Sequence, residues 1–334
     1  MLLNNRIYEK RSIHQLSGKK YRIIMFCRTF VTSKIKNKKC MAYKSGFVSI
    51  VGNPNVGKST LSNLFVGERL SIITPKAQTT RHKILGIVNK DDYQIVFSDT
   101  PGVLQPNYKL QESMLKFSKS ALVDADLILF ITDTVETPGK NEDFIKDVKK
   151  SDVPLLLVIN KIDLSTQDHL EKLIDTWKTL LPDAEIYPIS AQHKFNIENL
   201  YNRIIELIPE SPPYFEKDAL TDKPMRFFVS EIIREKILLY YQKEIPYSVE
   251  VEVDEFKEGQ HRTDINAVIH VVRDSQKGII IGHQGKALKK LGTEARKDLE
   301  SFLGKKIFLR LFVKVSKDWR DKGNFLKNFG YDQK

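Results

Sequence analysis

Cysteine is scarce in this chain of 334 residues. Both cysteines, Cys27 and Cys40, fall within the first 45 residues, so no disulfide can cross-link the rest of the chain. Small secreted domains usually depend on several disulfides, and we therefore expect a reducing compartment. Long apolar runs are also missing, since no stretch approaches the roughly 18 residues of a bilayer-spanning helix. We expect a soluble protein that is at most peripheral to a membrane.

Negative charge is nearly missing from the N-terminal 45 residues. That segment has a net charge of +11, residues 46–225 have −5 and residues 226–334 have +6, which gives +12 for the whole chain. A large polyanion should therefore meet the two flanks and not the acidic middle.

The basic N-terminal segment has two interpretations. A basic, acid-poor stretch is typical of an organellar transit peptide. The alternative is an upstream start codon, with Met41 as the natural beginning just before the first predicted strand, over 47–51. In either case we expect residues 1–40 to be absent from the working protein or unstructured in it.

A glycine-containing motif follows that first strand and predicts a phosphate site. Its glycines let the backbone curl so that successive N–H groups face phosphates, and a helix starting near Lys58 adds its positive end. Lys58 should reach the outer phosphates, and the Ser59 hydroxyl should hold Mg²⁺. The predicted loop consists of Gly52, Asn53, Pro54, Asn55, Val56, Gly57, Lys58, Ser59 and Thr60.

A second motif predicts that the bound base is guanine. The Asp163 carboxylate can accept two hydrogen bonds from the guanine edge, whereas adenine would leave a buried charge unpaired. Asn160 and Lys161 follow the apolar run 155–159, which is typical of a buried parallel strand. Ligands bind at the carboxyl ends of such strands. The remaining predicted guanine-site residues are Ser190 and Ala191.

The third motif predicts the magnesium site and the switch loops. Asp99 follows a predicted strand over 94–98 and should hold Mg²⁺ through water, while the Gly102 N–H approaches the terminal phosphate. The polar segment 74–82 is predicted as the first switch, and Thr80, preferred over Thr79, as a further Mg²⁺ ligand. The motif also contains Thr100 and Pro101. The predicted ligands are GTP or GDP with Mg²⁺, and the predicted catalytic residues are Lys58, Thr80 and Gly102.

Strand signals and helical patterns alternate from residue 46 to about 208. This predicts an α/β fold, a doubly wound and mostly parallel sheet. A helix and alternating strands after residue 226 predict a smaller α+β domain. The predicted parts are a basic extension (1–45), a GTPase domain (46–208), a proline-containing linker (209–225), an RNA-binding domain (226–316) and a basic tail (317–334).

A Gly-x-x-Gly motif at 282–285 predicts RNA binding. A KH module clamps a single-stranded RNA backbone with such a loop, although the bare motif is more often an ordinary turn. The lysines beside it favour RNA. The predicted contacts are Lys277, Gly278, Ile279, Ile280, Ile281, Gly282, His283, Gln284, Gly285, Lys286, Lys289 and Lys290. Solvent-facing side chains are the alternative for His283 and Gln284, and Trp319 either stacks on a base or packs against the domain.

Together these motifs resemble the Era family, GTPases of the TrmE-Era-EngA-like superfamily with a C-terminal type II KH domain. The resemblance covers residues 42–334 and is most specific in the runs 52–60, 78–82, 99–103, 275–282 and 317–320. It implies a GTPase that binds the 3′ end of 16S ribosomal RNA and assists maturation of the 30S subunit. It also implies a cytoplasmic protein, in some members peripheral on the inner membrane; a transit peptide would instead imply an organellar matrix. We expect a monomer.

The pair of residues that directly follows the Asp99–Gly102 motif predicts that GTP hydrolysis is slow. Many GTPases orient the attacking water with a glutamine there, whereas this chain has Val103 and Leu104. No arginine can be assigned as a finger in cis. The main alternative function is an RNA-binding scaffold in which GTP is mainly structural. A third possibility is a tRNA-modifying or tandem-domain GTPase: the single phosphate loop and the lack of an internal repeat exclude the tandem form, and the sequence shows no second enzyme site.

Overall fold

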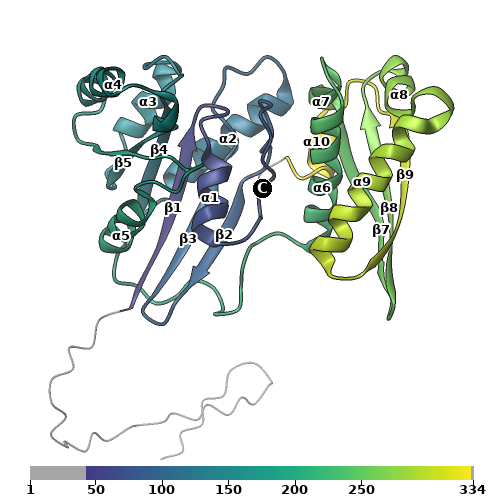
Figure 1. Cartoon of the computed structure of the whole chain (residues 1–334), viewed down its shortest axis with the longest axis horizontal. Coiled ribbons are helices and arrows are strands. Elements are labelled where there is room, and N and C mark those ends of the chain that lie inside the picture. Colours follow the sequence, from purple (N-terminus) through teal and green to yellow (C-terminus); the bar gives the residue numbers. More distant parts are fainter. Residues whose placement is uncertain (1–42, 332–334) are drawn as a thin grey trace, which may run out of the picture. The chain divides into compact units, whose positions relative to one another are not determined.

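The structure is a computed structural model that describes residues 43–331 (Figure 1). The predictions for Cys27, Cys40 and Met41 lie outside these residues. Strand β1 (Lys44–Gly52) begins two residues before the predicted start of the GTPase domain. No helix among residues 43–331 is long and apolar enough to cross a bilayer.

The first domain is built on a six-stranded sheet in the order β2-β3-β1-β4-β5-β6. Every neighbouring pair is parallel except β2 with β3. This confirms the predicted doubly wound, mostly parallel fold. The other strands are β2 (Ile84–Asn89), β3 (Tyr93–Asp99), β4 (Leu127–Asp133), β5 (Leu155–Asn160) and β6 (Glu185–Pro188), and the helices are α1 (Lys58–Val66), α2 (Lys109–Val123), α3 (Glu142–Lys149), α4 (Gln167–Leu180) and α5 (Ile197–Leu207).

Two apolar clusters, one on each face of the sheet, hold this domain together. One cluster contains side chains of α1 and α5, and the other contains side chains of α3 and α4. The central strand β4 is buried along its whole length, which explains its unbroken apolar sequence. Strand β2 was not predicted, because Gly86 and a short length weaken its alternation.

The second domain contains a three-stranded sheet in the order β7-β8-β9, with β8 and β9 parallel. The pattern predicts its strands over 248–256, 264–272 and 307–315, and they lie within two residues of these bounds. Ile279, Ile280 and Ile281, predicted as RNA contacts that offer an apolar floor for bases, lie in the last turn of helix α8. The elements are α6 (Met225–Tyr240), α7 (Ile245–Ser248), β7 (Glu250–Glu258), β8 (Arg262–Val271), α8 (Asp274–Ile281), η2 (His283–Gly285), α9 (Lys286–Leu303) and β9 (Lys306–Val315).

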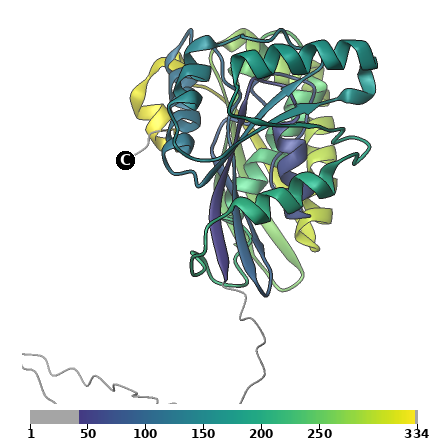
Figure 2. The same ribbon diagram turned by 90° about the vertical axis from the view of Figure 1, so that its left-hand side faces the viewer.

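The segment predicted as a basic tail is folded. It forms η3 (Trp319–Asp321) and α10 (Gly323–Asn328) and packs against helix α2 of the first domain (Figure 2). Leu326 and Tyr331 are buried there against α2 residues that include Met114. Trp319 is also buried, and its indole N–H donates to the Ser248 carbonyl at 3.0 Å. Of the two alternatives for Trp319, packing is therefore correct.

The predicted linker, residues 209–225, is hydrogen-bonded to strand β2 of the sheet. The Ile87 N–H donates to the Leu220 carbonyl at 2.8 Å, and the Asn89 side chain donates to the Ala219 carbonyl at 3.0 Å. These bonds satisfy groups of β2, the edge strand of the sheet. The linker therefore covers an exposed edge as well as joining the domains.

Candidate nucleotide and RNA sites

A pocket of about 510 Å³ brings the first-domain motifs together at the carboxyl ends of β1, β3 and β5. Seven further predicted site residues do not line the pocket: Gly52, Asn53, Val56, Asp99, Thr100, Pro101 and Ser190. Ile72, Ile73, Thr74 and Gln78 line it without having been predicted as site residues. The predicted residues on its surface are Pro54, Asn55, Gly57, Lys58, Ser59, Thr60, Thr80, Gly102, Asn160, Lys161, Asp163 and Ala191.

Asn160 connects the phosphate loop to the guanine loop. Its side-chain amide donates to the Val56 carbonyl at 2.9 Å and accepts from the Ala191 N–H at 3.0 Å. Gly57 lies directly under this amide with a φ of 99°, and a Cβ there would be 2.2 Å from the Asn160 nitrogen. Only glycine fits at that position, so the amide can hold both loops at one spacing.

The loop after Asp99 also lies close to the phosphate loop. The Val103 N–H donates to the Gly52 carbonyl at 3.0 Å. A Cβ on Gly102 would lie 2.7 Å from Pro54. This close approach leaves the backbone of Gly102 beside the phosphate loop, where its N–H can meet a terminal phosphate.

Three oxygen-bearing side chains form a site that fits Mg²⁺. The Ser59 and Thr80 hydroxyl oxygens are 2.8 Å apart. Both Asp99 carboxylate oxygens are buried without a hydrogen bond of good geometry. Burial raises the Asp99 pKa, although nearby Ser71, Ser59 and Lys58 oppose the shift. A cation with a preference for oxygen ligands would satisfy these groups.

The structure favours Thr80 over Thr79 as the ligand. The Thr79 hydroxyl donates to the Lys76 carbonyl at 2.6 Å and lies 2.7 Å from the Thr74 hydroxyl. Its side chain therefore faces its own loop, whereas Thr80 faces Ser59.

Lys58 is buried with its ammonium held in the phosphate loop. The Nζ donates to the Asn53 carbonyl at 2.7 Å. Burial lowers the Lys58 pKa to about 8, and Asp99 and Glu136 act in the opposite direction. A phosphate would add further counter-charge beside this buried cation.

On the guanine side of the pocket, hydrogen bonds and an ion pair orient the side chains of Asp163 and Lys161. The Ser190 hydroxyl donates to Asp163 at 2.5 Å, which orients the carboxylate. The Lys161 ammonium donates to the Asn55 carbonyl and to Asp133, each at 2.6 Å. Asp133 was missed, although it ends β4 in the way that Asp99 ends β3, and this position is the signal that identifies it.

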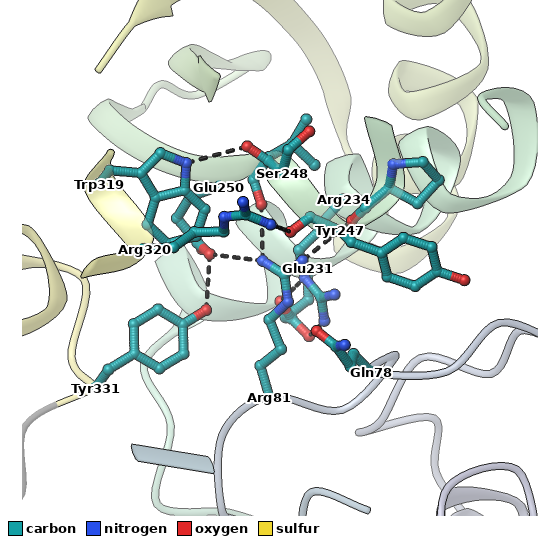
Figure 3. A network of polar contacts seen from close by, with 12 residues as sticks. Gln78, Arg81, Glu231, Arg234, Tyr247, Ser248, Glu250, Trp319, Arg320 and Tyr331 are labelled. Atoms are coloured by element: carbon teal, nitrogen blue, oxygen red, sulfur yellow. Dashed lines mark hydrogen bonds and ion pairs between the residues drawn. The ribbon is translucent and has the colours of Figure 1, made fainter. Parts of the chain in front are cut away.

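The second domain contacts the first switch segment directly (Figure 3). Arg81 is fully buried, donates to the Val249 carbonyl at 2.7 Å and the Pro246 carbonyl at 3.0 Å, and pairs with Glu250 at 3.1 Å. The Tyr331 hydroxyl donates to the same carboxylate at 2.7 Å. These partners are distant in sequence, so no local pattern predicted this network.

Arg234 of α6 holds the other side of the switch segment. Its guanidinium donates to the Thr79 carbonyl and is paired with Glu231 at 2.6 Å. Both neighbours of Thr80 are thus hydrogen-bonded to the second domain, Thr79 through its carbonyl and Arg81 through its side chain. A ligand that moves Thr80 must move or strain these contacts.

The predicted RNA loop lies between α8 and α9. Gly282 and Gly285 both have positive φ, 70° and 74°, and a Cβ on Gly282 would lie 2.6 Å from that of Ala287. Exposed side chains surround the loop: His283, Gln284, Lys286, Lys289 and Lys290.

The isoleucines before the loop do not all face solvent. Ile279 is 50% exposed, and Ile281 is half-buried. Ile280 is fully buried in the domain core, where its carbonyl accepts from the Tyr241 hydroxyl at 2.8 Å. The predicted RNA contact by the Ile280 side chain is therefore wrong, because a helix turns successive side chains to different faces.

Comparison with known proteins places both domains. The family described as 50S ribosome-binding GTPase matches residues 47–161, and the KH domain family matches residues 244–320. A structure of Era in complex with MgGDPNP and nucleotides 1506–1542 of 16S ribosomal RNA is 40% identical, with a TM-score of 0.83, over 87% of this chain and 100% of that one. A single-residue variant of Era from Aquifex aeolicus, bound to GDP·AlF4⁻, is 41% identical, with the same TM-score and coverage. The chain belongs to the Era family, GTPases in which a KH domain follows the GTPase domain.

Proposed function

We propose that this protein is a GTP-hydrolysing assembly factor that binds the 3′ end of 16S ribosomal RNA and assists maturation of the 30S subunit. The observation that carries the proposal is the contact of the switch segment with the KH domain on both sides of Thr80. The related Era structure that contains MgGDPNP and 16S nucleotides supports the choice of ligands.

The pocket residues have different roles in phosphoryl transfer. Ser59, Thr80 and Asp99 would hold Mg²⁺, which neutralises charge on the β- and γ-phosphates when it is bound. Lys58 supplies a buried cation at the phosphates, and the Gly102 N–H holds the terminal one. These groups position the substrate and stabilise developing charge.

Neither of the two residues that follow Gly102, Val103 and Leu104, has a side-chain amide that could orient the attacking water. Val103 is buried, and its N–H is bonded to the phosphate loop. Of the described residues that line the pocket, none is an arginine. Since an arginine finger in trans raises hydrolysis by on the order of 10³- to 10⁵-fold, we propose that hydrolysis by the protein alone is slow. Turnover of roughly 10 s⁻¹ without a partner would contradict this.

We further propose that the bound nucleotide controls RNA binding. GTP with Mg²⁺ would draw Thr80 into the metal shell, and Thr79 and Arg81 would transmit that position to α6 and to the segment before β7. The rival function is an RNA-binding scaffold that holds GTP as structure. It predicts equal RNA affinity in both nucleotide states, because a ligand with no differential affinity shifts no equilibrium.

A single binding experiment tests these alternatives. The full chain is titrated with labelled single-stranded RNA that copies the 3′ end of small-subunit ribosomal RNA, in the presence of GDP or a non-hydrolysable GTP analogue. Gly282→Asp/Gly285→Asp is the matched variant, since it places charge in the RNA loop without touching the pocket. Binding that requires the analogue and is lost in the variant is expected; binding indifferent to nucleotide would favour the scaffold.

We also propose a cytoplasmic protein with peripheral contact to the inner membrane, or an organellar matrix protein if residues 1–40 are a transit peptide. The net charge of +6 on residues 226–334 supports attraction to an anionic lipid surface. Flotation with anionic vesicles tests the contact: co-flotation that falls at high salt is expected, and absence of the protein from the vesicle fraction would contradict it.

A further inference from the structure

The outer face of β9 carries alternating cations and aromatic rings that the nucleotide and RNA sites described above do not use. Five side chains at every second position are exposed, while their neighbours Ile307, Leu309, Leu311 and Val313 pack into the KH core. A strand sends alternate side chains to opposite faces, so the exposed set forms one column. We call it the β9 column: Lys306, Phe308, Arg310, Phe312 and Lys314.

The two phenylalanines of the β9 column are exposed in a way that protein packing does not explain. Phe312 is 54% exposed and Phe308 is 39% exposed. Phe308 lies between two guanidinium groups, those of Arg310 at 4.8 Å and Arg262 at 5.1 Å. Among the described residues, no ring or cation packs on Phe312 by comparable contact.

Edge protection accounts for only part of the β9 column. β9 is at the edge of its sheet, and lysines on an edge strand hinder pairing with other chains. That explanation covers Lys306, Arg310 and Lys314. It leaves the two phenylalanines unexplained, because exposed rings on an edge strand promote association.

The charge of the strand matches a polyanion. Residues 305–317 contain five basic side chains and no acidic one. On the neighbouring strand β8, Asp264 is paired with Arg262 at 2.8 Å, and Glu255 of β7 is hydrogen-bonded to Asn266 of β8. Proteins that bind single-stranded nucleic acid combine such cations, which contact phosphates, with rings on which bases stack.

The position of the β9 column suits RNA that already lies in the KH loop. Helix α8, which leads into Gly282, packs against the core face of β9, opposite the β9 column. Since β9 is an edge strand, RNA that leaves the loop can pass over this open edge to reach the column. Near the end of β8 the same sheet face is covered, because the His270 ring packs on the Phe329 ring with 5.0 Å between their centroids. A KH loop clamps about four nucleotides, so a longer strand must continue onto neighbouring surface.

We propose that the β9 column is a second binding surface for single-stranded RNA, on which a base stacks on Phe312 while Arg310 and Lys314 contact phosphates. The inference rests on the proposed RNA binding by the KH loop and extends it to the nucleotides that flank the clamped ones. A protein partner for the same face is the alternative that the test below separates.

The test compares two RNAs that copy the 3′ end of small-subunit ribosomal RNA, about 8 and about 20 nucleotides long, on the full chain. Phe312→Ala should weaken binding of the longer RNA by about tenfold and leave the shorter one unchanged. Gly282→Asp/Gly285→Asp should weaken both. Phe302→Ala is the matched control, because Phe302 is 40% exposed in the same domain but lies on helix α9, and it should change neither.

Charge and stacking are separated by further variants. The slope of log affinity against log salt concentration reports the number of phosphate contacts. Arg310→Gln should reduce this slope by about 1, whereas Phe312→Ala should leave it unchanged. Phe312→Trp adds an exposed tryptophan to a chain whose tryptophans, Trp177 and Trp319, are buried, so its fluorescence should be quenched by the longer RNA only.

Two results would overturn the proposal, and they differ. If Phe312→Ala and Arg310→Gln bind the longer RNA as wild type does and Phe312→Trp shows no quenching, the β9 column does not bind RNA. If the wild-type protein binds neither RNA, the KH function has failed and the proposal fails with it. Thermal melting and nucleotide binding of each variant establish that it is folded.

Discussion

The Lys58 ammonium is buried in the protein, and this burial has a measurable consequence for nucleotide binding. Its pKa is lowered to about 8, mainly by burial. A bound phosphate raises the pKa again, so the complex holds more protons than the free protein above pH 8. We therefore predict that nucleotide affinity falls by up to about tenfold per pH unit above pH 8.

Lys58→Arg provides the comparison for this prediction. Arginine stays protonated over this range, so the variant should bind nucleotide with little dependence on pH between pH 7 and pH 9, even if its affinity is lower throughout. Isothermal titration in buffers of different ionisation enthalpy counts the protons taken up. Equal pH profiles for the wild type and the variant would show that Lys58 does not titrate here.

His82 makes the stability of the protein depend on pH. Its ring is stacked on Tyr331 with 4.3 Å between centroids, and its pKa is lowered to about 3, first by burial and then by Lys223, Arg234 and Arg81. The unfolded state binds a proton near pH 6.5 and the folded state does not. Stability contributed by the neutral ring is therefore complete above pH 6.5 and is lost as the pH falls towards 3.

The prediction is a difference in slope between wild type and His82→Phe. Between pH 7 and pH 5 the free energy of unfolding of the wild type should fall by about 2 kcal/mol more than that of the variant. Denaturant unfolding at several pH values measures it. Parallel slopes would mean that the ring gains its proton in the folded state as readily as in the unfolded one.

At the scale of elements, the switch segment is joined to the KH domain by groups that are buried. Arg81 and Glu250 are 0% and 8% exposed in their side chains. Removing one partner of a buried pair leaves the other charge without compensation and costs about 3–5 kcal/mol. We expect Arg81→Ala to lower the free energy of unfolding by that amount.

An exposed pair in the same chain serves as the control. Arg203 pairs with Glu185 at 2.6 Å on the surface, where water and salt screen the two charges. Arg203→Ala should therefore be almost neutral. Arg81→Ala should also reduce the difference in RNA affinity between the GTP and GDP states, and an unchanged difference would show that coupling runs through other contacts.

At the scale of the whole molecule, the C-terminal segment ties the two domains together. Residues after Lys322 bury Leu326 and Tyr331 against α2, and burial of one large apolar side chain contributes about 1.5–3 kcal/mol. A chain ending at Lys322 loses these contacts and leaves Glu250 without the Tyr331 hydroxyl. We predict that it unfolds in two separate transitions, whereas the full chain unfolds in one.

Differential scanning calorimetry of the two chains, each with and without GDP, tests this. In the shortened chain GDP should raise the transition temperature of the GTPase domain only, because a ligand stabilises the part that binds it. A single transition that GDP shifts as a whole would show that the remaining contacts, including Arg81, suffice for coupling.

The sequence by itself determined the ligand class and the order of the domains. The phosphate loop, Asp99 and the Asn160 to Asp163 motif each lie within a few residues at the end of an apolar strand, so the pattern is local and can be recognised without the fold. Type and order of most elements followed from periodicity for the same reason.

Only the tertiary structure decided which residues connect these motifs. Arg81 and Tyr331 both donate to Glu250, Lys161 donates to Asp133, and Trp319 donates to the Ser248 carbonyl, all across large separations in sequence. Ile280 belongs to the core because of where α8 packs. Contacts between distant segments depend on how whole elements pack, and they leave no periodic trace in the residues around them.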